Sequence, residues 1–207
     1  MNVETVAQQP PLATAGRGDR VARTREAIVA STLNLAQEGE VSPIVRDIAK
    51  AAGVSARTVF QHFADTAELY VAALNRMLTH VGAAPEINPQ APLDQRLGAV
   101  ISHRSTNFEQ LRPMWTFVSN LQRRSSEASD KVLEMYSSNR DQLANGFGPE
   151  LSAMPAERGK NALNALALVL SPEGWVVLRE RLGMTVDQAR EEWRFVADSI
   201  FSDQADH

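Results

Sequence analysis

Several residue types that define common classes of functional site are missing or rare in this chain of 207 residues. It contains no cysteine, which excludes disulfides and thiolate zinc sites and gives no reason to expect an oxidising compartment. Its four histidines show no paired metal-ligand spacing, and no glycine-rich phosphate loop follows a strand pattern. We therefore expect no metal, no cofactor and no catalytic site, although a catalytic serine is harder to exclude because serine is common.

Long apolar runs are also absent. No segment approaches the roughly 20 residues of a membrane-spanning helix, and the N-terminus lacks the basic start and the apolar run of a signal peptide. Hydrophobic residues still make up 43% of the chain, which is ample for a packed core. We therefore expect a soluble, cytoplasmic protein with no membrane partner.

The most informative segment is residues 44–63, which read IVRDIAKAAGVSARTVFQHF. Gly53 is placed to end a first short helix in a left-handed conformation, and Ser55 is placed to cap a second helix. Val59 and Phe63 would return that second helix to the core. Apolar residues at helical spacing predict the buried face of the first helix: Ile44, Ile48, Ala51 and Ala52. The segment therefore predicts a helix, a tight turn and a second helix.

The opposite face of the second helix is polar. It would carry a guanidinium, a hydroxyl, an amide and an imidazole, which are groups able to reach phosphates or base edges from a helix in a major groove. These groups belong to Arg57, Thr58, Gln61 and His62. Arg46 would lie on the exposed face of the first helix.

The uninterrupted run IAKAAGVSARTVFQHF resembles the helix-turn-helix of TetR-family transcriptional regulators, and the resemblance extends from about Arg20 to Met77. It implies an all-α fold, a homodimer, a double-stranded DNA operator and a small-molecule inducer. Where the family often has a tyrosine and a lysine that meet phosphates, this chain has Phe60 and Thr66. The full DNA-binding set that we predict is Arg46, Ser55, Arg57, Thr58, Phe60, Gln61, His62 and Thr66.

Composition suggests a disordered arm (1–18), and the family resemblance implies two further parts: a helix-turn-helix domain (19–64) and a helical domain for connection, ligand binding and dimerisation (65–207). Residues 1–64 hold seven basic and six acidic side chains, whereas residues 65–207 hold fourteen and nineteen. This asymmetry fits a DNA-reading head on an acidic body. Four arginines near the start of the first helix either touch DNA or form a solvated helix start: Arg17, Arg20, Arg23 and Arg25.

The middle of the chain offers candidate ligand-binding residues. Arg104 lies within the apolar stripe of a helix predicted from Leu93 to near Pro113, so it needs an anionic partner. That partner could be a carboxylate such as Glu134 or Asp141, or an acidic ligand, unless the side chain reaches solvent. The family resemblance implies an inducer pocket whose other candidates, which could equally be packing residues, are His103, Asn107, Phe108, Met114, Trp115, Phe117 and Tyr136.

The last 50 residues suggest a dimer interface. Residues 162–170 are apolar almost all round, which a soluble helix tolerates only when it is covered on both sides. The cover could be a second subunit, as in many family members, or the protein's own core. The interface residues that we predict are Leu163, Leu166, Leu170, Trp193, Val196 and Ile200.

Together these observations predict a dimeric repressor that binds a palindromic operator and is released by a small-molecule inducer. Two alternatives remain: an architectural or activating DNA-binding protein without an inducer, and a helical enzyme.

Overall fold

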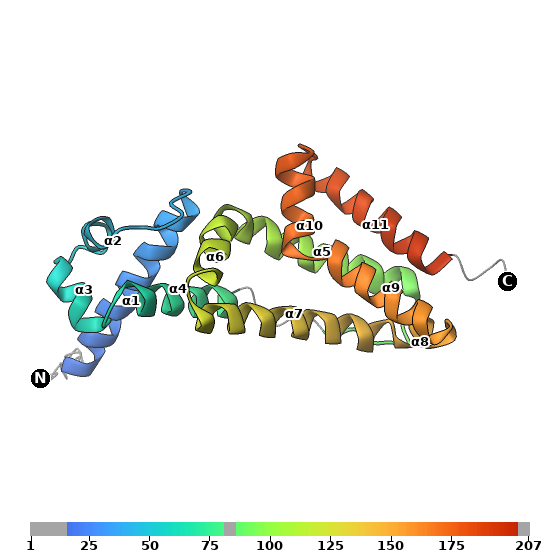
Figure 1. Cartoon of the computed structure of the whole chain (residues 1–207), viewed down its shortest axis with the longest axis horizontal. Coiled ribbons are helices and arrows are strands. Elements are labelled where there is room, and N and C mark those ends of the chain that lie inside the picture. The colour runs from blue at the N-terminus through green and yellow to red at the C-terminus, as the bar shows by residue number, and fades with distance from the viewer. Residues whose placement is uncertain (1–15, 81–85, 203–207) are drawn as a thin grey trace, which may run out of the picture.

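The computed structural model describes residues 16–80 and 86–202, and all regular structure within these two ranges is helical. The predicted all-α class is confirmed. The molecule is elongated, with a small head at its N-terminal end and a larger helical body (Figure 1). Residues 1–15 of the predicted arm, residues 81–85 and residues 203–207 lie outside the described residues.

The head consists of α1 (Arg17–Gln37), α2 (Val45–Ala51) and α3 (Ala56–His62). Two glycines with positive φ end the first two helices, Gly39 at +100° and Gly53 at +68°, because a residue without a Cβ adopts this conformation at no steric cost. The core of the head is a single apolar cluster of Ile28, Val29, Ile48, Ala49, Val59, Phe63, Leu69 and Ala73.

The start of α2 differs from the sequence-based prediction. We expected Ile44 on the buried face of this helix, but Ile44 is the N-cap residue, without a side-chain cap, and is 52% exposed. The hydroxyl of Tyr70 donates to the carbonyl oxygen of Pro43 at 2.5 Å, which ties this loop to α4. In α2 it is Ala49, rather than Ala51, that is buried beside Ile48.

The helix α4 (Thr66–His80) joins the head to the body and belongs to both cores. Leu69 and Ala73 pack in the head cluster, whereas Val71, Leu74 and Met77 pack in the body cluster. A rotation or shift of α4 must therefore disturb the packing of both parts, which couples them mechanically.

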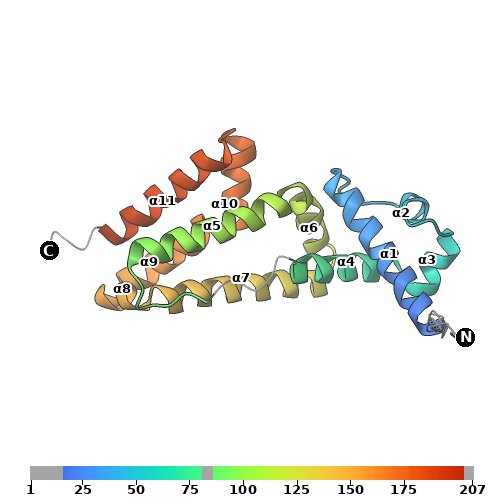
Figure 2. The same cartoon turned by 180° about the vertical axis from the view of Figure 1, so that it is seen from behind.

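The body is built from the remaining helices, and its longest members are α5 (Leu93–Leu111) and α7 (Ser126–Gly146). Seen from behind, α5 runs along the length of the body (Figure 2). The shorter elements are η1 (Arg112–Met114), α6 (Trp115–Gln122), α8 (Gly148–Ala153), α9 (Ala156–Val169), α10 (Pro172–Val176), the π-helical turn η2 (Val177–Arg181) and α11 (Val186–Ser202).

A partly buried carboxylate fastens α5 to α10 and η2. Glu109 accepts hydrogen bonds from the indole of Trp175 at 2.8 Å and from Arg179 at 3.0 and 3.1 Å. Arg112 also donates to it at 3.2 Å. These donors, with Arg179 contributing most, lower the pKa of Glu109 to about 2. The sequence pattern did not single out Glu109, because two of its partners, Trp175 and Arg179, lie 66 and 70 residues away.

In the two described ranges no single helix is long and apolar enough to cross a membrane; by length and composition alone, the bent pair Ala156–Val169 and Pro172–Arg181 passes that test.

Candidate nucleic-acid interface

The short helix α3 is fixed at its start by Ser55. The backbone N–H of Thr58 donates to Ser55 Oγ at 3.0 Å, and the two hydroxyl oxygens lie 2.9 Å apart. The predicted cap is therefore present. Val59 and Phe63 are each 1% exposed, so one side of α3 is anchored in the head and the other side faces outward.

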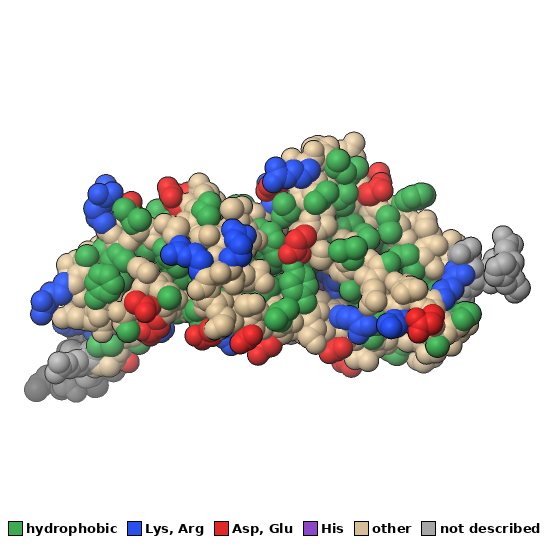
Figure 3. Space-filling view, in the orientation of Figure 1, with side chains coloured by type: hydrophobic (Ala, Val, Ile, Leu, Met, Phe, Trp, Pro, Cys, Tyr) green, Lys and Arg blue, Asp and Glu red, His purple; other side chains and the backbone are tan. Residues whose placement is uncertain are grey.

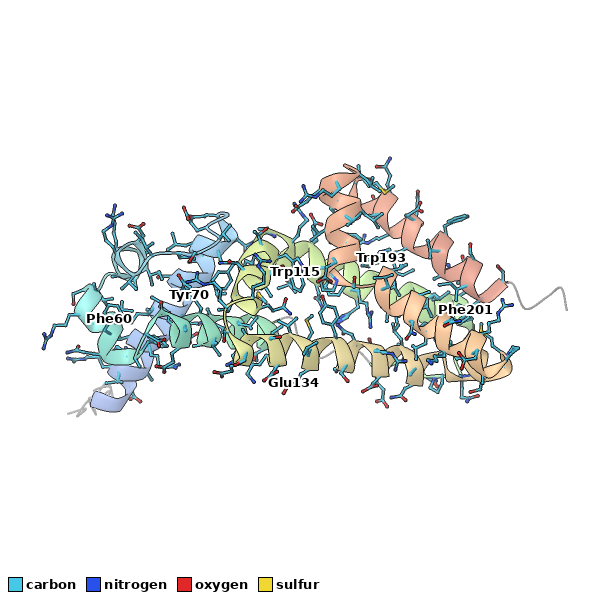
Figure 4. All side chains as sticks on the ribbon, in the orientation of Figure 1. Phe60, Tyr70, Trp115, Glu134, Trp193 and Phe201 are labelled. Carbon is cyan, nitrogen blue, oxygen red and sulfur yellow. The ribbon has the colours of Figure 1, made fainter. Side chains whose placement is uncertain are left out.

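The outward side of α3 carries the most accessible of the predicted DNA-binding residues. Arg57, Phe60 and Gln61 are exposed, and His62 and Thr58 are half-buried. Phe60 projects from the end of the molecule, away from the body (Figure 4), and its ring is 52% exposed. An exposed aromatic ring next to a guanidinium and an amide can contact thymine methyls and base edges in a major groove.

Two other predicted residues lie outside α3. The side chain of Arg46 is 80% exposed and pairs with the neighbouring Asp47 at 3.1 Å. Because an exposed ion pair contributes little to stability, a DNA phosphate could take the place of Asp47 at little cost. Thr66 is half-buried. It lines a cavity of about 90 Å³ between α4 and α6, on the side of α4 that faces the body.

The arginines of α1 differ in their surroundings. The guanidinium of Arg25 stacks on the ring of Phe63, 4.5 Å from its centroid, and lies 4.0 Å from Glu68. Arg20 and Arg23 are exposed, and Arg23 Nε donates to the carbonyl oxygen of Asp19 at 3.2 Å. The side chain of Arg17 lies outside the described residues. Basic side chains are visible at the head end of the surface (Figure 3).

The eight predicted ligand-binding residues lie in several parts of the described body. His103 and Asn107 contact each other at 3.0 Å, and burial, with the charge of Arg104, lowers the pKa of His103. Phe108, Trp115 and Phe117 are buried in the body core. Met114 lines a pocket between α1, α4 and α5, whereas Tyr136 lines a groove beside α9.

The predicted carboxylate partner of Arg104 is wrong. Arg104 is 3% exposed and donates to the carbonyl oxygens of Leu170 at 2.9 Å and Asn139 at 2.8 Å. Glu134 points outward from α7 (Figure 4). Burial lowers the pKa of Arg104 to about 10, since its acceptors are neutral oxygens.

Four of the predicted dimer-interface residues are instead core residues of the protomer. Leu163, Leu166, Leu170 and Trp193 are at most 8% exposed, and Trp193 packs against the ring of Trp175 with centroids 4.6 Å apart. The other two, Val196 and Ile200, are half-buried. The apolar pattern of the tail therefore reflects packing of α9 and α11 against their own body, because both helices contact α5, α7 or each other.

No group of three or more histidine, aspartate or glutamate side chains in the described part of the chain could hold a metal ion. The functional groups that the head presents to solvent lie on the capped helix α3: a guanidinium, an amide and an aromatic ring. Fold and surface together define a helix-turn-helix DNA-binding protein.

Comparison with known proteins gives the family. Residues 28–73 match the family model described as bacterial regulatory proteins, tetR family. Residues 28–73 are therefore a TetR-family helix-turn-helix segment, and regulators of that family are generally DNA-binding proteins without catalytic activity. No curated protein sequence matches the chain.

Solved structures share the fold over most of the chain. A tetR-family transcriptional regulator from Streptomyces coelicolor has a TM-score of 0.65 and 17% identity, covering 88% of this chain and 90% of its own. MexZ, a repressor from Pseudomonas aeruginosa, has a TM-score of 0.61 and 22% identity, with 88% and 96% covered. NalD, a repressor of a multidrug efflux pump in the same organism, has a TM-score of 0.53, 20% identity and the same coverage.

Proposed function

We propose that this protein is a dimeric repressor that binds a palindromic operator and leaves it when a small molecule binds. The observation that carries the proposal is the outward face of α3, where Arg57, Phe60 and Gln61 are exposed at the end of an elongated molecule. Repression is supported by the likeness in fold to MexZ and NalD, which are both described as repressors.

A second copy of the chain is the partner that we propose for α9 and α11. Their large exposed apolar side chains are Leu168, 72% exposed, and Phe195, 67% exposed. Between the two helices lies a shallow groove with Ala162, Ala165 and Ile200 on its walls. Apolar side chains are visible over the C-terminal helices on the space-filling surface (Figure 3). Apolar surface of this kind is buried favourably against a second copy.

Dimerisation would give the protein two recognition helices. Two heads spaced by about one turn of the double helix, roughly 34 to 36 Å, can enter successive major grooves of a palindrome. A ligand that prefers a different spacing of the heads would shift the population away from the operator-bound form.

The proposal is tested by selecting duplexes that bind the purified protein from a random pool and by footprinting the best of them. We expect a palindrome with two protected half-sites, and affinity that falls steeply as salt rises. Failure to retain any duplex at low ionic strength would refute DNA binding. Retention of duplexes without a common sequence would favour an architectural role.

Arg57→Ala should weaken binding to the selected operator by about 1 to 3 kcal/mol if the guanidinium reads a base. Sequence preference should relax at one position of each half-site. The measurement is a fluorescence anisotropy titration with operator and random duplexes. Arg181→Ala removes the same charge from an exposed position of the body and is the matched control. If Arg57→Ala binds both duplexes with the affinity of the wild type, Arg57 does not contact DNA.

Phe60→Tyr should strengthen binding to operator and random duplexes by a similar factor. The added hydroxyl can donate to a phosphate, and a hydrogen bond to a charged group contributes about 1.5 to 3 kcal/mol at most, so a several-fold gain is expected. The exposed position of Phe60 means that folding should be unaffected. A loss of affinity would indicate that the phenyl ring itself contacts the bases.

A further inference from the structure

Between the head and the body lies a pocket with a volume of about 380 Å³. Its walls come from both parts of the molecule: α1 and α4 on one side, and α5 with η1 on the other. The lining residues are Ala30, Leu33, Asn34, Gln37, Arg76, Met77, Gln110, Leu111 and Met114. Hereafter we call it the seam pocket.

The seam pocket has the size and lining of a small-molecule site. Ligand pockets of proteins typically measure about 300 to 1,000 Å³ and combine apolar walls with a few polar groups. Met77, Leu111 and Met114 are at most 8% exposed and form apolar walls. Methionine side chains adapt to ligands of different shape.

The polar side chains of the seam pocket indicate the class of ligand. Asn34, Gln37 and Gln110 supply three amides at exposed positions, so a ligand can reach them from solvent. Arg76 supplies a guanidinium whose side chain is 26% exposed and which pairs with the largely exposed Glu26 on α1. Because the Glu26 side chain is 62% exposed, its carboxylate can turn into solvent, and the anionic group of a ligand can take its place beside the partly buried Arg76.

The position of the seam pocket links occupancy to the head. The C-terminal half of α1 contacts η1, and Ala36 of α1 already belongs to the body core. Any change in the angle between head and body must therefore widen or narrow this pocket. An operator requires one separation of the two heads, so a ligand that favours a different angle between head and body would weaken binding to the operator.

We propose that the seam pocket binds a small amphipathic molecule with a carboxylate or similar anionic group, and that its occupancy lowers affinity for the operator. This inference rests on the proposed DNA-binding function. The sequence suggested eight ligand-binding residues, and of these only Met114 lines the seam pocket. Because coupling between two binding sites is reciprocal, operator DNA must lower affinity for the ligand by the same factor.

The absence of cysteine from the chain allows occupancy to be tested without knowing the natural ligand. In Gln110→Cys, the single thiol stands at the pocket and can be capped with a benzyl group by benzyl methanethiosulfonate, then released with dithiothreitol. We expect capping to lower operator affinity by roughly five- to 150-fold, the usual range of coupling between sites, and reduction to restore it. Ala99→Cys, at an exposed position of the same helix, is the matched control and should not respond.

The outcomes separate this inference from the proposed function. Operator binding by uncapped Gln110→Cys that capping leaves unchanged, or strengthens, would overturn the seam-pocket proposal alone. No operator binding by the wild-type protein would overturn the proposed function and this inference with it.

The anionic class of ligand is tested with anilinonaphthalene sulfonate, a fluorescent amphipathic anion. Arg76→Gln should weaken its binding by at least about fivefold, because the charge-assisted hydrogen bond is lost, whereas Arg181→Gln should not. Saturating operator DNA should weaken binding of the dye to the wild-type protein. Equal affinity of the wild type and Arg76→Gln, with no effect of the operator, would overturn the assignment.

Discussion

The double variant Leu168→Glu/Phe195→Glu is expected to elute as a monomer and to lose operator binding. Both side chains are largely exposed in the protomer, so two new carboxylates leave its fold intact but are desolvated and repel each other across a two-fold interface. A dimer that engages both half-sites gains about 10²- to 10⁴-fold in affinity from effective concentration, so the monomer should lose at least about 100-fold. Size-exclusion chromatography with light scattering and an operator titration measure the two effects.

The matched control is Leu133→Glu, which introduces the same charge at a 58% exposed leucine of α7. It should remain dimeric and bind the operator as the wild type does. A dimeric profile of the double variant would show that another surface joins the two copies. Leu166→Glu is unsuitable for this test, because Leu166 is 1% exposed and a buried carboxylate would unfold the protomer.

Glu109→Gln is expected to destabilise the protein by about 2 kcal/mol at neutral pH, since the charge that faces Arg179 and Arg112 is lost while the shape is kept. For a chain of this size the change corresponds to a fall of roughly 4 to 8 °C in Tm. Thermal unfolding at one protein concentration measures it. Glu180→Gln removes a carboxylate that pairs with Arg112 at 3.3 Å at the surface, and it should change stability by less than about 1 kcal/mol.

The same carboxylate predicts a pH dependence. The folded-state pKa of Glu109 is lowered from 4.5 to about 2. The ionised carboxylate therefore stabilises the fold at every pH above the pKa that Glu109 has in the unfolded chain. That contribution should disappear as the pH falls from about 4.5 toward 2, because the unfolded chain takes up the proton first. In Glu109→Gln, stability should decline less steeply over this window. An identical decline in both proteins would mean that other groups carry the acid sensitivity.

The head was largely predictable from the sequence. Gly53 ends the first helix of the motif and Ser55 caps the second, and each depends only on residues within one or two turns. The face of α2 that enters the core was predicted only in part, because the apolar pattern does not show that Ile44 precedes the helix as its N-cap residue.

The body was predictable as helices but not as a set of contacts. The sequence left the partner of Arg104 open between a body carboxylate, an acidic ligand and solvent, whereas its hydrogen bonds go to carbonyl oxygens at a helix end and on α7 and to the amide oxygen of Gln142. A backbone oxygen is present at every residue, so no side-chain pattern can indicate which one will serve as a partner. Glu109 escaped notice for a related reason, since an isolated glutamate on a helix gives no sign of distant arginines.

The sequence by itself determined the helical class, the helix-turn-helix and the outward face of its second helix, because periodicity, caps and glycines act over a few residues. Only the tertiary structure decided which apolar side chains of the tail are core and which are open to a partner. When a helix is apolar on every side, the sequence does not show which side packs against the core. The seam pocket also depends on the tertiary structure. Its walls come from three helices and the turn η1, and the distances between these elements cannot be read from any one stretch of the sequence.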